Sequence, residues 1–471
     1  MKRQGAWREL AVAGGIGRFL LVCLGVWLHA ADSLATATVV PALVSEIRDT
    51  AYVAWTISLY QIGAVVAGSA TARLSQRTGI GNVLAGAATI YGAGCLTAAL
   101  APTMAIVLTG RLIQGVGGGM LPSLSYVAIQ QWFAAALWGR LFGIVAVIWS
   151  AGSLLGPLIG GVFVHLGAWR LTFWSFALQA GLLAGMAAIV MPSRPAGANK
   201  VEQWNFFPLL VLSAASYAIA AAGAANDRDI SIVEGASGVG LLWLAAWLDK
   251  RSPHRLLPED TLSWRRPVGL GLVTVFALAA ATTGFWAHGP LILQAMFGTD
   301  PLVSGYILAG EALAWTAGTM ALAGIKPEAG RVAIRAGAIL VFIGAAGFAL
   351  AVPLGYFAGI ISCALLQGLG FGVSWPSIVH LIVQNAREHE KMLAAAAPAT
   401  VQTIAYSLGA AATGIAANAV GLAEGITASS ARIAGFWVFA AFIPVLSLGL
   451  LSAWRFTREE GLIVAASRRS S

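Results

Sequence analysis

Three ionisable side chains lie inside long apolar stretches of the sequence, where a charge is costly. Asp32, Arg111 and Glu311 each fall within such a stretch. At the centre of a membrane-spanning helix a charged residue costs about 2.5–3.5 kcal/mol on insertion scales, so each should face protein or water and have a partner. If Asp32 pairs with Arg111, a proton or a cation can compete with the arginine for the single negative charge. We therefore predict that Asp32, Glu311 and Arg111 couple protons, and that Asp32 and Glu311 also bind substrate.

His29 is a fourth candidate for proton coupling. It precedes Asp32 by three residues and so lies on nearly the same face of a helix. Imidazole exchanges protons near neutral pH, as a proton relay requires. A neutral histidine bonded to a backbone carbonyl or to Asp32 explains the position equally well. Arg111 has a similar alternative: an arginine that only holds the acidic helix in place through an ion pair would have the same sequence.

Aromatic and polar side chains deep in the apolar stretches are candidates for a substrate site. The chain has 17 tryptophans, and those near the ends of apolar stretches fit the aromatic belts of membrane proteins. Deeper aromatic faces attract cations, although plain helix packing explains each of them as well. Besides Asp32 and Glu311, the candidate substrate-binding residues are Gln61, Tyr126, Trp149, Trp286, Trp315, Trp375 and His380.

The composition predicts an all-α polytopic membrane protein that positions these residues. Of the 471 residues, 58% are hydrophobic and 10% are charged, whereas soluble domains carry about 25% charged residues. Apolar stretches long enough to be membrane helices, without weak alternating segments, argue against a membrane barrel. The fourteen candidate spans are residues 17–42, 52–72, 82–101, 103–131, 138–165, 170–191, 205–224, 231–249, 267–295, 301–324, 331–352, 354–385, 392–421 and 431–455.

The basic residues predict the orientation. With both termini in the cytoplasm, 23 of the 28 Lys and Arg residues fall on the inner side and four on the outer side, with Arg111 in mid-span. We expect a bacterial-type inner membrane protein, surrounded by lipid and monomeric. A twelve-span alternative, in which 205–249 lies on the membrane or re-enters it, keeps the same parity. The net charge of +9 is dispersed over short loops, which argues against a nucleic-acid partner.

An internal repeat predicts two related halves. Gln114-Gly-x-Gly-x-Gly119 recurs as Gln367-Gly-x-Gly-x-Gly372, in spans 4 and 12. The repeat relates spans 1–6 to spans 9–14, and leaves two inserted helices between them. The predicted domains are therefore an N-terminal six-helix half over 1–192, the inserted helices with their linkers over 193–266, and a C-terminal six-helix half over 267–471.

Span 5 concentrates glycine and proline, which are both unfavourable inside a helix. Glycines that recur every four residues form a smooth face on which another helix can approach closely. We expect this face to pack the two halves together and to limit leak, although ordinary small-residue packing also explains it. The residues are Gly143, Gly152, Gly156, Pro157, Gly160 and Gly161.

These motifs resemble the fourteen-span drug:proton antiporter family of the major facilitator superfamily. The resemblance covers nearly the whole chain. It is carried by the acid-containing run Ala31–Leu43, by Trp55 and Tyr60, by Arg111-x-x-Gln114-Gly115, by the span 5 glycines, which resemble an antiporter signature, and by Trp169-Arg170. The resemblance implies a major facilitator fold, export by alternating access, and an acid in the tenth span that serves substrate or protons.

One loop departs from the family. After span 2 the family pattern resembles G-x-L-x-D-R-x-G-R-R, but here Gln76 stands at the acid position and Gly81-Asn82 near the final basic pair. In the loop after span 10, Pro327 stands at the acid position. The resemblance implies that this loop is a charge latch, so here the latch is weakened or rebuilt with other partners.

The sequence therefore predicts a proton-coupled antiporter that exports hydrophobic, cationic or zwitterionic small molecules, as multidrug-efflux proteins linked to antibiotic resistance do. No P-loop is present, so the proton gradient is the expected energy source, without a cofactor. The three cysteines show no metal-ligand spacing, and no catalytic constellation indicates an enzyme. Two alternatives stay open: a dedicated transporter of one metabolite, such as a siderophore, sugar or amino-acid derivative, and a transport-like membrane sensor.

Overall fold

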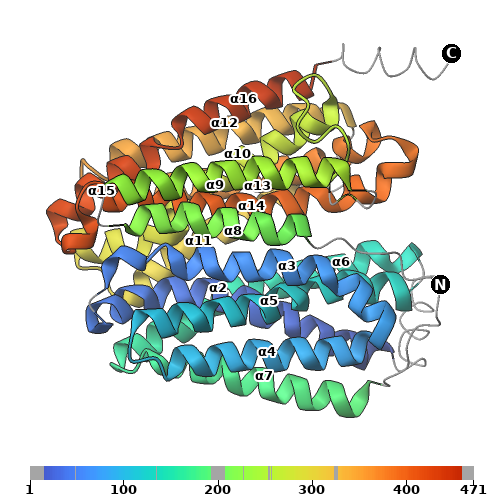
Figure 1. Cartoon of the computed structure of the whole chain (residues 1–471), viewed down its shortest axis with the longest axis horizontal. Helices are drawn as coiled ribbons and strands as arrows, with labels where there is room; N and C mark the ends of the chain where they lie inside the picture. The colour runs from blue at the N-terminus through green and yellow to red at the C-terminus, as the bar shows by residue number, and fades with distance from the viewer. Residues whose placement is uncertain are drawn as a thin grey trace. The chain divides into compact units, whose positions relative to one another are not determined.

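A computed structural model describes residues 15–47, 49–133, 135–191, 207–225, 228–252, 255, 257–322 and 327–458 (Figure 1). The described part is helical, which confirms the predicted all-α class. Its elements are α2 (Gly15–Ile47), η1 (Thr50–Tyr52), α3 (Trp55–Thr78), α4 (Ile80–Ala99), α5 (Met104–Trp132), α6 (Ala135–His165), α7 (Arg170–Val190), α8 (Phe207–Ala224), α9 (Arg228–Arg251), α10 (Pro267–Phe297), α11 (Pro301–Ala321), α12 (Pro327–Ala351), α13 (Phe357–Asn385), η2 (Glu388–Glu390), α14 (Lys391–Asn418), η3 (Leu422–Glu424), α15 (Ala428–Ala440) and α16 (Ile443–Phe456).

Twelve segments of the described chain are long and apolar enough to cross a membrane. They include α8 and α9, the two predicted inserted helices. Helices α11 and α14 are 21 and 28 residues long but are less apolar, and they are outside these twelve. The count of fourteen spans therefore stays a prediction. Both chain ends, where we predicted a cytoplasmic location, lie outside the described residues.

One local prediction is wrong, and one predicted span is divided into two helices. The loop expected after span 2 is largely helical, because α3 continues to Thr78 and only Gly79, with a φ of 86°, separates it from α4. Gln76 is thus an exposed residue in the last turns of α3. The last predicted span, 431–455, matches the candidate span Ala428–Phe456. Its helix is divided into α15 and α16, and Pro444 lies in the first turn of α16, where a proline needs no helical N–H partner.

The chain divides into two compact units. Within the described residues, the first unit comprises 15–42 and 59–191, and the second comprises 43–58 and 207–458. Helices α8 and α9 thus belong to the second unit, and the predicted boundary at 192 lies outside the described residues.

In the first unit, α4 packs against both α5 and α7. Tyr91, Leu121 and Phe176 are fully buried in its hydrophobic core. In the second unit, α10 is the central helix, in contact with α11, α12, α13, α14, α15 and α16. An apolar helix that is buried on all sides is expected at the centre of a bundle. The rings of Phe285, Phe348 and Phe439 stack beside it at centroid distances of 4.7 and 4.5 Å.

The connection between α2 and α3 belongs to the second unit because polar contacts hold it there. Trp55 Nε1 donates a hydrogen bond to the carbonyl of Ala220 in α8, at 3.0 Å. Asn418, the last residue of α14, donates to the carbonyls of Ala51 and Gly223 at 2.8 and 2.9 Å. One amide therefore satisfies carbonyls from two separate segments.

Candidate functional site

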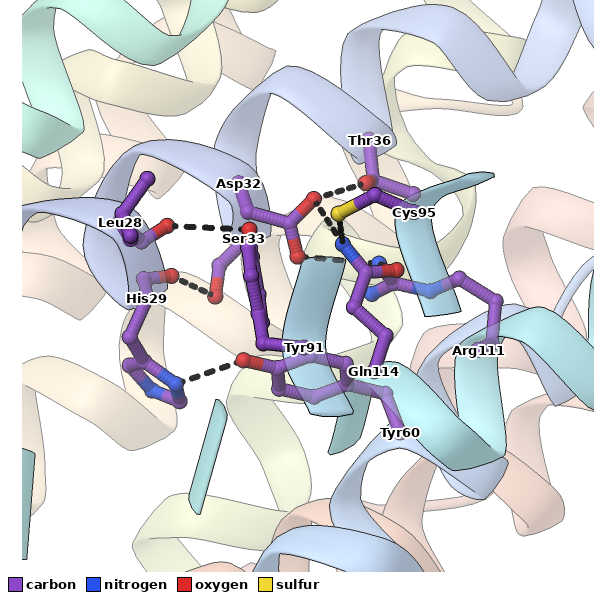
Figure 2. A network of polar contacts seen from close by, with 10 residues as sticks. All are labelled: Leu28, His29, Asp32, Ser33, Thr36, Tyr60, Tyr91, Cys95, Arg111 and Gln114. Atoms are coloured by element: carbon purple, nitrogen blue, oxygen red, sulfur yellow. Dashed lines mark hydrogen bonds and ion pairs between the residues drawn. The ribbon is translucent and has the colours of Figure 1, made fainter. Parts of the chain in front are cut away.

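A buried ion pair joins α2 to α5 in the first unit (Figure 2). Asp32 Oδ2 lies 2.9 Å from Arg111 Nη1, and the two side chains are 0% and 3% exposed. The pairing predicted from the sequence is confirmed. A buried ion pair is favourable only where further hydrogen bonds satisfy its remaining atoms. The neighbours of Asp32 therefore decide whether this charge is stable.

Gln114 supplies most of the missing hydrogen bonds. It lies three residues after Arg111 on α5, so both side chains reach the same place. Arg111 Nη1 donates to Gln114 Oε1 at 2.7 Å, and Gln114 Nε2 donates to Asp32 Oδ1 at 2.9 Å and to Cys95 Sγ at 3.1 Å. Thr36, one turn along α2, donates to Asp32 Oδ1 at 3.1 Å. The carboxylate thus accepts bonds from three side chains.

Tyr60 extends this network to His29. Its hydroxyl lies 2.7 Å from His29 Nδ1, and its ring lies under the guanidinium of Arg111, 4.4 Å from Cζ to the ring centroid. The His29 ring is in turn 5.2 Å from the ring of Trp149, which is 38% exposed. Figure 2 shows Tyr60 between His29 and Arg111. The sequence marked Tyr60 only through the family resemblance, because no local spacing links α2 to α3.

The glycine face of α6 packs against α2 of the same unit. A Cβ atom on Gly156 would collide with the carbonyl oxygen of Ala31, and one on Gly160 would lie 2.7 Å from the carbonyl oxygen of Ala35. Gly152 is similarly close to Ala30. Gly152, Gly156 and Gly160 therefore pack against the helix that carries Asp32, and the expectation that this face packs the two halves together stays a prediction. Pro157 and Gly161 are buried within α6, and Gly143 lies in its first half.

This contact leads to a stability prediction. Gly156→Ala is expected to lower the free energy of unfolding by about 1–3 kcal/mol, because the methyl group overpacks the contact with α2. Gly181→Ala in α7 is the matched control, since nothing lies within 4 Å of a Cβ there. Thermal unfolding in detergent can be followed with a thiol-reactive dye, because Cys23, Cys95 and Cys363 are buried. Equal melting temperatures for the two variants would contradict the prediction.

The second unit buries an acid of its own. Glu311, in the middle of α11, is 4% exposed, and its Oε2 has no hydrogen-bond partner among the described residues. Tyr406 of α14 is another buried residue of this unit. The Tyr406 hydroxyl accepts a hydrogen bond from Gln402 Nε2 at 3.1 Å, and its ring lies 5.2 Å from that of Trp286. Trp286 is thus an aromatic neighbour of Tyr406.

The other predicted aromatic residues of this unit form one cluster. Trp315 lies one turn after Glu311, and its ring centroid is 4.3 Å from that of Phe371. Trp375 stacks on Phe371 at 5.6 Å and lies 6.4 Å from Trp315. Phe371 is buried in the core, and Trp315 and Trp375 are partly buried against it.

Three predicted substrate-binding residues lie outside these groups. Gln61 is buried in α3, next to Tyr60, whereas Tyr126 is 52% exposed on α5. His380 is exposed on α13. Among the described residues, no group of three His, Cys, Asp or Glu side chains could hold a metal ion.

Comparisons with known proteins agree on one family. A family model described as the Major Facilitator Superfamily matches residues 22–410. A Mycobacterium tuberculosis protein named "probable multidrug-efflux transporter" is 29% identical over 483 aligned positions, which cover 97% of each chain. A protein of Escherichia coli named as an uncharacterized transporter is 25% identical and covers 86% of this chain and 90% of its own.

Solved structures show the same fold at low sequence identity. A bacterial homologue of the human lysosomal transporter Spinster has a TM-score of 0.66 and is 13% identical, covering 94% of this chain and 98% of its own. A D-xylose–proton symporter has a TM-score of 0.65 and is 15% identical, covering 94% of this chain and 97% of its own.

Proposed function

Because the chain belongs to the major facilitator superfamily, we propose that it is a proton-coupled antiporter that exports hydrophobic, cationic or zwitterionic small molecules. The family makes the chain a multi-pass membrane transporter and not an enzyme. The proposal includes fourteen spans, arranged as two six-helix halves with α8 and α9 inserted, and a bacterial inner membrane location with both termini inside.

The observation that carries the proposal is the Asp32 carboxylate, held inside a candidate span by Arg111 and Gln114. An ionisable residue buried in this way marks an ion or proton pathway by default. The names of the mycobacterial relatives favour efflux, and the basic residues of the sequence favour the proposed orientation.

The residues of the chain suggest how exchange would proceed. A proton from outside that binds to Asp32 removes the negative charge that pairs with Arg111. A proton that binds to Glu311 removes the negative charge that would pair with a cationic substrate. Substrate then leaves, and the two halves rock to the inward-facing state. Loss of the protons inside restores both negative charges for the next substrate. Proton and substrate thus compete for the same carboxylates, which is the requirement for antiport.

Transport by purified protein in proteoliposomes tests this function. With an imposed pH gradient, we expect ethidium and tetraphenylphosphonium to move against the proton flux, and fluorescein, an anion, not to move. Nigericin, which dissipates the gradient, should stop the movement of both cations. Export that continues without a pH gradient, or proton-driven uptake of a single solute in the same direction as the proton, would overturn the proposal.

A further inference from the structure

The two units repeat the same close helix contacts. A Cβ atom on Gly115 of α5 would collide with the carbonyl oxygen of Tyr60, and one on Gly368 of α13 would collide with that of Glu311. These two glycines are equivalent in the sequence repeat. Tyr60 of the first unit and Glu311 of the second therefore occupy equivalent positions.

Other contacts extend the equivalence to the neighbouring helices. Gly94 of α4 packs against the backbone of Gln114, as Gly344 of α12 packs against that of Gln367. On the opposite side, Gly156 of α6 approaches the carbonyl of Ala31 in α2. Gly409 of α14 approaches the carbonyl of Ala280 in α10 in the same way.

This register assigns a counterpart to each residue around Gln114. Asp32 follows Ala31, Cys95 follows Gly94, and Arg111 is four residues before Gly115. The residues at the same offsets in the second unit are Ala281, Ala345 and Ala364, each 1% exposed. The repeat thus keeps the glutamine, as Gln367, and replaces the acid, the thiol and the guanidinium around it by methyl groups.

These replacements explain why Gln367 has unsatisfied atoms. The Gln367 side chain is fully buried, and neither its Oε1 nor its Nε2 has a hydrogen-bond partner in the described part of the chain. The Oε2 of Glu311 is in the same condition. Leaving a buried polar atom unsatisfied costs about 1–3 kcal/mol, and more for a charged group. Two such side chains at equivalent positions of a known network indicate an external partner.

We propose that Glu311 and Gln367 form a seat for a planar cation with N–H donors, such as the guanidinium or amidinium group of a substrate. In the first unit the guanidinium of Arg111 donates to Gln114 and lies over Tyr60. At the equivalent place in the second unit, Gln367 Oε1 accepts one N–H and the carboxylate of Glu311, in place of the Tyr60 ring, neutralises the charge. The protein supplies its own guanidinium to one unit, and the substrate supplies it to the other.

This inference rests on the proposed function and narrows its substrate class. Guanidinium offers several N–H donors in one plane, and carboxylates bind such groups through two parallel hydrogen bonds. A quaternary ammonium has the same charge and no N–H donor. It therefore neutralises Glu311 by charge alone and gives Gln367 Oε1 no hydrogen-bond donor.

Two matched probes test the preference. Hexylguanidinium and hexyltrimethylammonium carry the same alkyl chain and charge, and their dissociation constants can be measured by calorimetry on the purified full-length protein. We expect hexylguanidinium to bind about tenfold more tightly. Gln367→Leu should remove that tenfold advantage and leave the affinity for hexyltrimethylammonium unchanged. Glu311→Gln should weaken both probes, whereas Ser362→Ala, an exposed control on α13, should change neither.

A variant that fills the seat with an arginine of the protein keeps the test independent of the folding of Gln367→Leu. Ala364→Arg places a guanidinium at the position that Arg111 has in the first unit, and should abolish hexylguanidinium binding. Its melting temperature should fall sharply when Glu311→Gln is added, because the new arginine then loses its partner. Equal melting temperatures for the single and the double variant would count against the seat.

The outcomes separate this inference from the proposed function. Equal affinities for both probes, or an unchanged preference in Gln367→Leu, would show that Glu311 and Gln367 do not form this binding site. Water would then be the partner of the amide. Neither result would affect the measurement of proton-coupled export of cations. Absence of proton-coupled export in the wild-type protein would overturn the proposed function instead.

Discussion

Asp32→Asn is expected to lower the number of protons released when substrate binds to the purified protein, because Glu311 is then the one remaining proposed source. Wild-type protein in weakly buffered detergent solution should release protons on addition of a transported cation, detected with a pH-sensitive dye. The asparagine has a similar shape and keeps acceptor and donor atoms, but it has no proton to exchange. Asp32 is an expected source of a released proton because it is an acid buried inside a candidate span.

Asp49→Asn is the matched control for this prediction, because the same change is made in the connection between α2 and α3, away from the ion pair. It should release as many protons as the wild type. Glu311→Gln should lower the number of protons released per substrate without abolishing the release. Unchanged proton release in both Asp32→Asn and Glu311→Gln would show that neither carboxylate couples transport to protons.

The sequence was most informative where physics restricts the choices. Buried charge in an apolar stretch is so costly that Asp32 and Arg111 could be paired without a structure, and the structure confirms this pair. The helices could be placed from apolar length in the same way. Apolar length does not predict where a helix ends. Helix α3, for example, continues to Thr78 through polar residues that are typical of a loop.

Contacts between distant segments could not be derived from spacing. Nothing in the local sequence shows that Tyr60 contacts His29, or that the glycines of α6 approach Ala30, Ala31 and Ala35 of α2. The repeat of Gln114 as Gln367 was visible in the sequence. Two of the three partners around each glutamine come from other helices, so only the structure shows that alanines replace them in the second unit.

The largest effect on stability is expected when Arg111 alone is changed. In Arg111→Gln the carboxylate of Asp32 stays buried without its cation, and breaking a buried ion pair from one side costs about 3–5 kcal/mol. Asp32→Asn alone strands the guanidinium in the same way. The double variant Asp32→Asn/Arg111→Gln leaves no buried charge, and its amides can bond to each other and to Gln114. It should therefore be more stable than either single variant.

A double-mutant cycle measures this coupling and separates two roles of the arginine. Melting temperatures and proton release are compared for the wild type, the two single variants and the double variant. If Arg111 both clamps α2 and tunes the charge of Asp32, the double variant regains its stability but releases no protons from this site. If the loss of stability in the double variant equals the sum of the losses in the two single variants, the interaction between Asp32 and Arg111 contributes little to stability. Proton release that returns together with stability would place the coupling charge elsewhere in the chain.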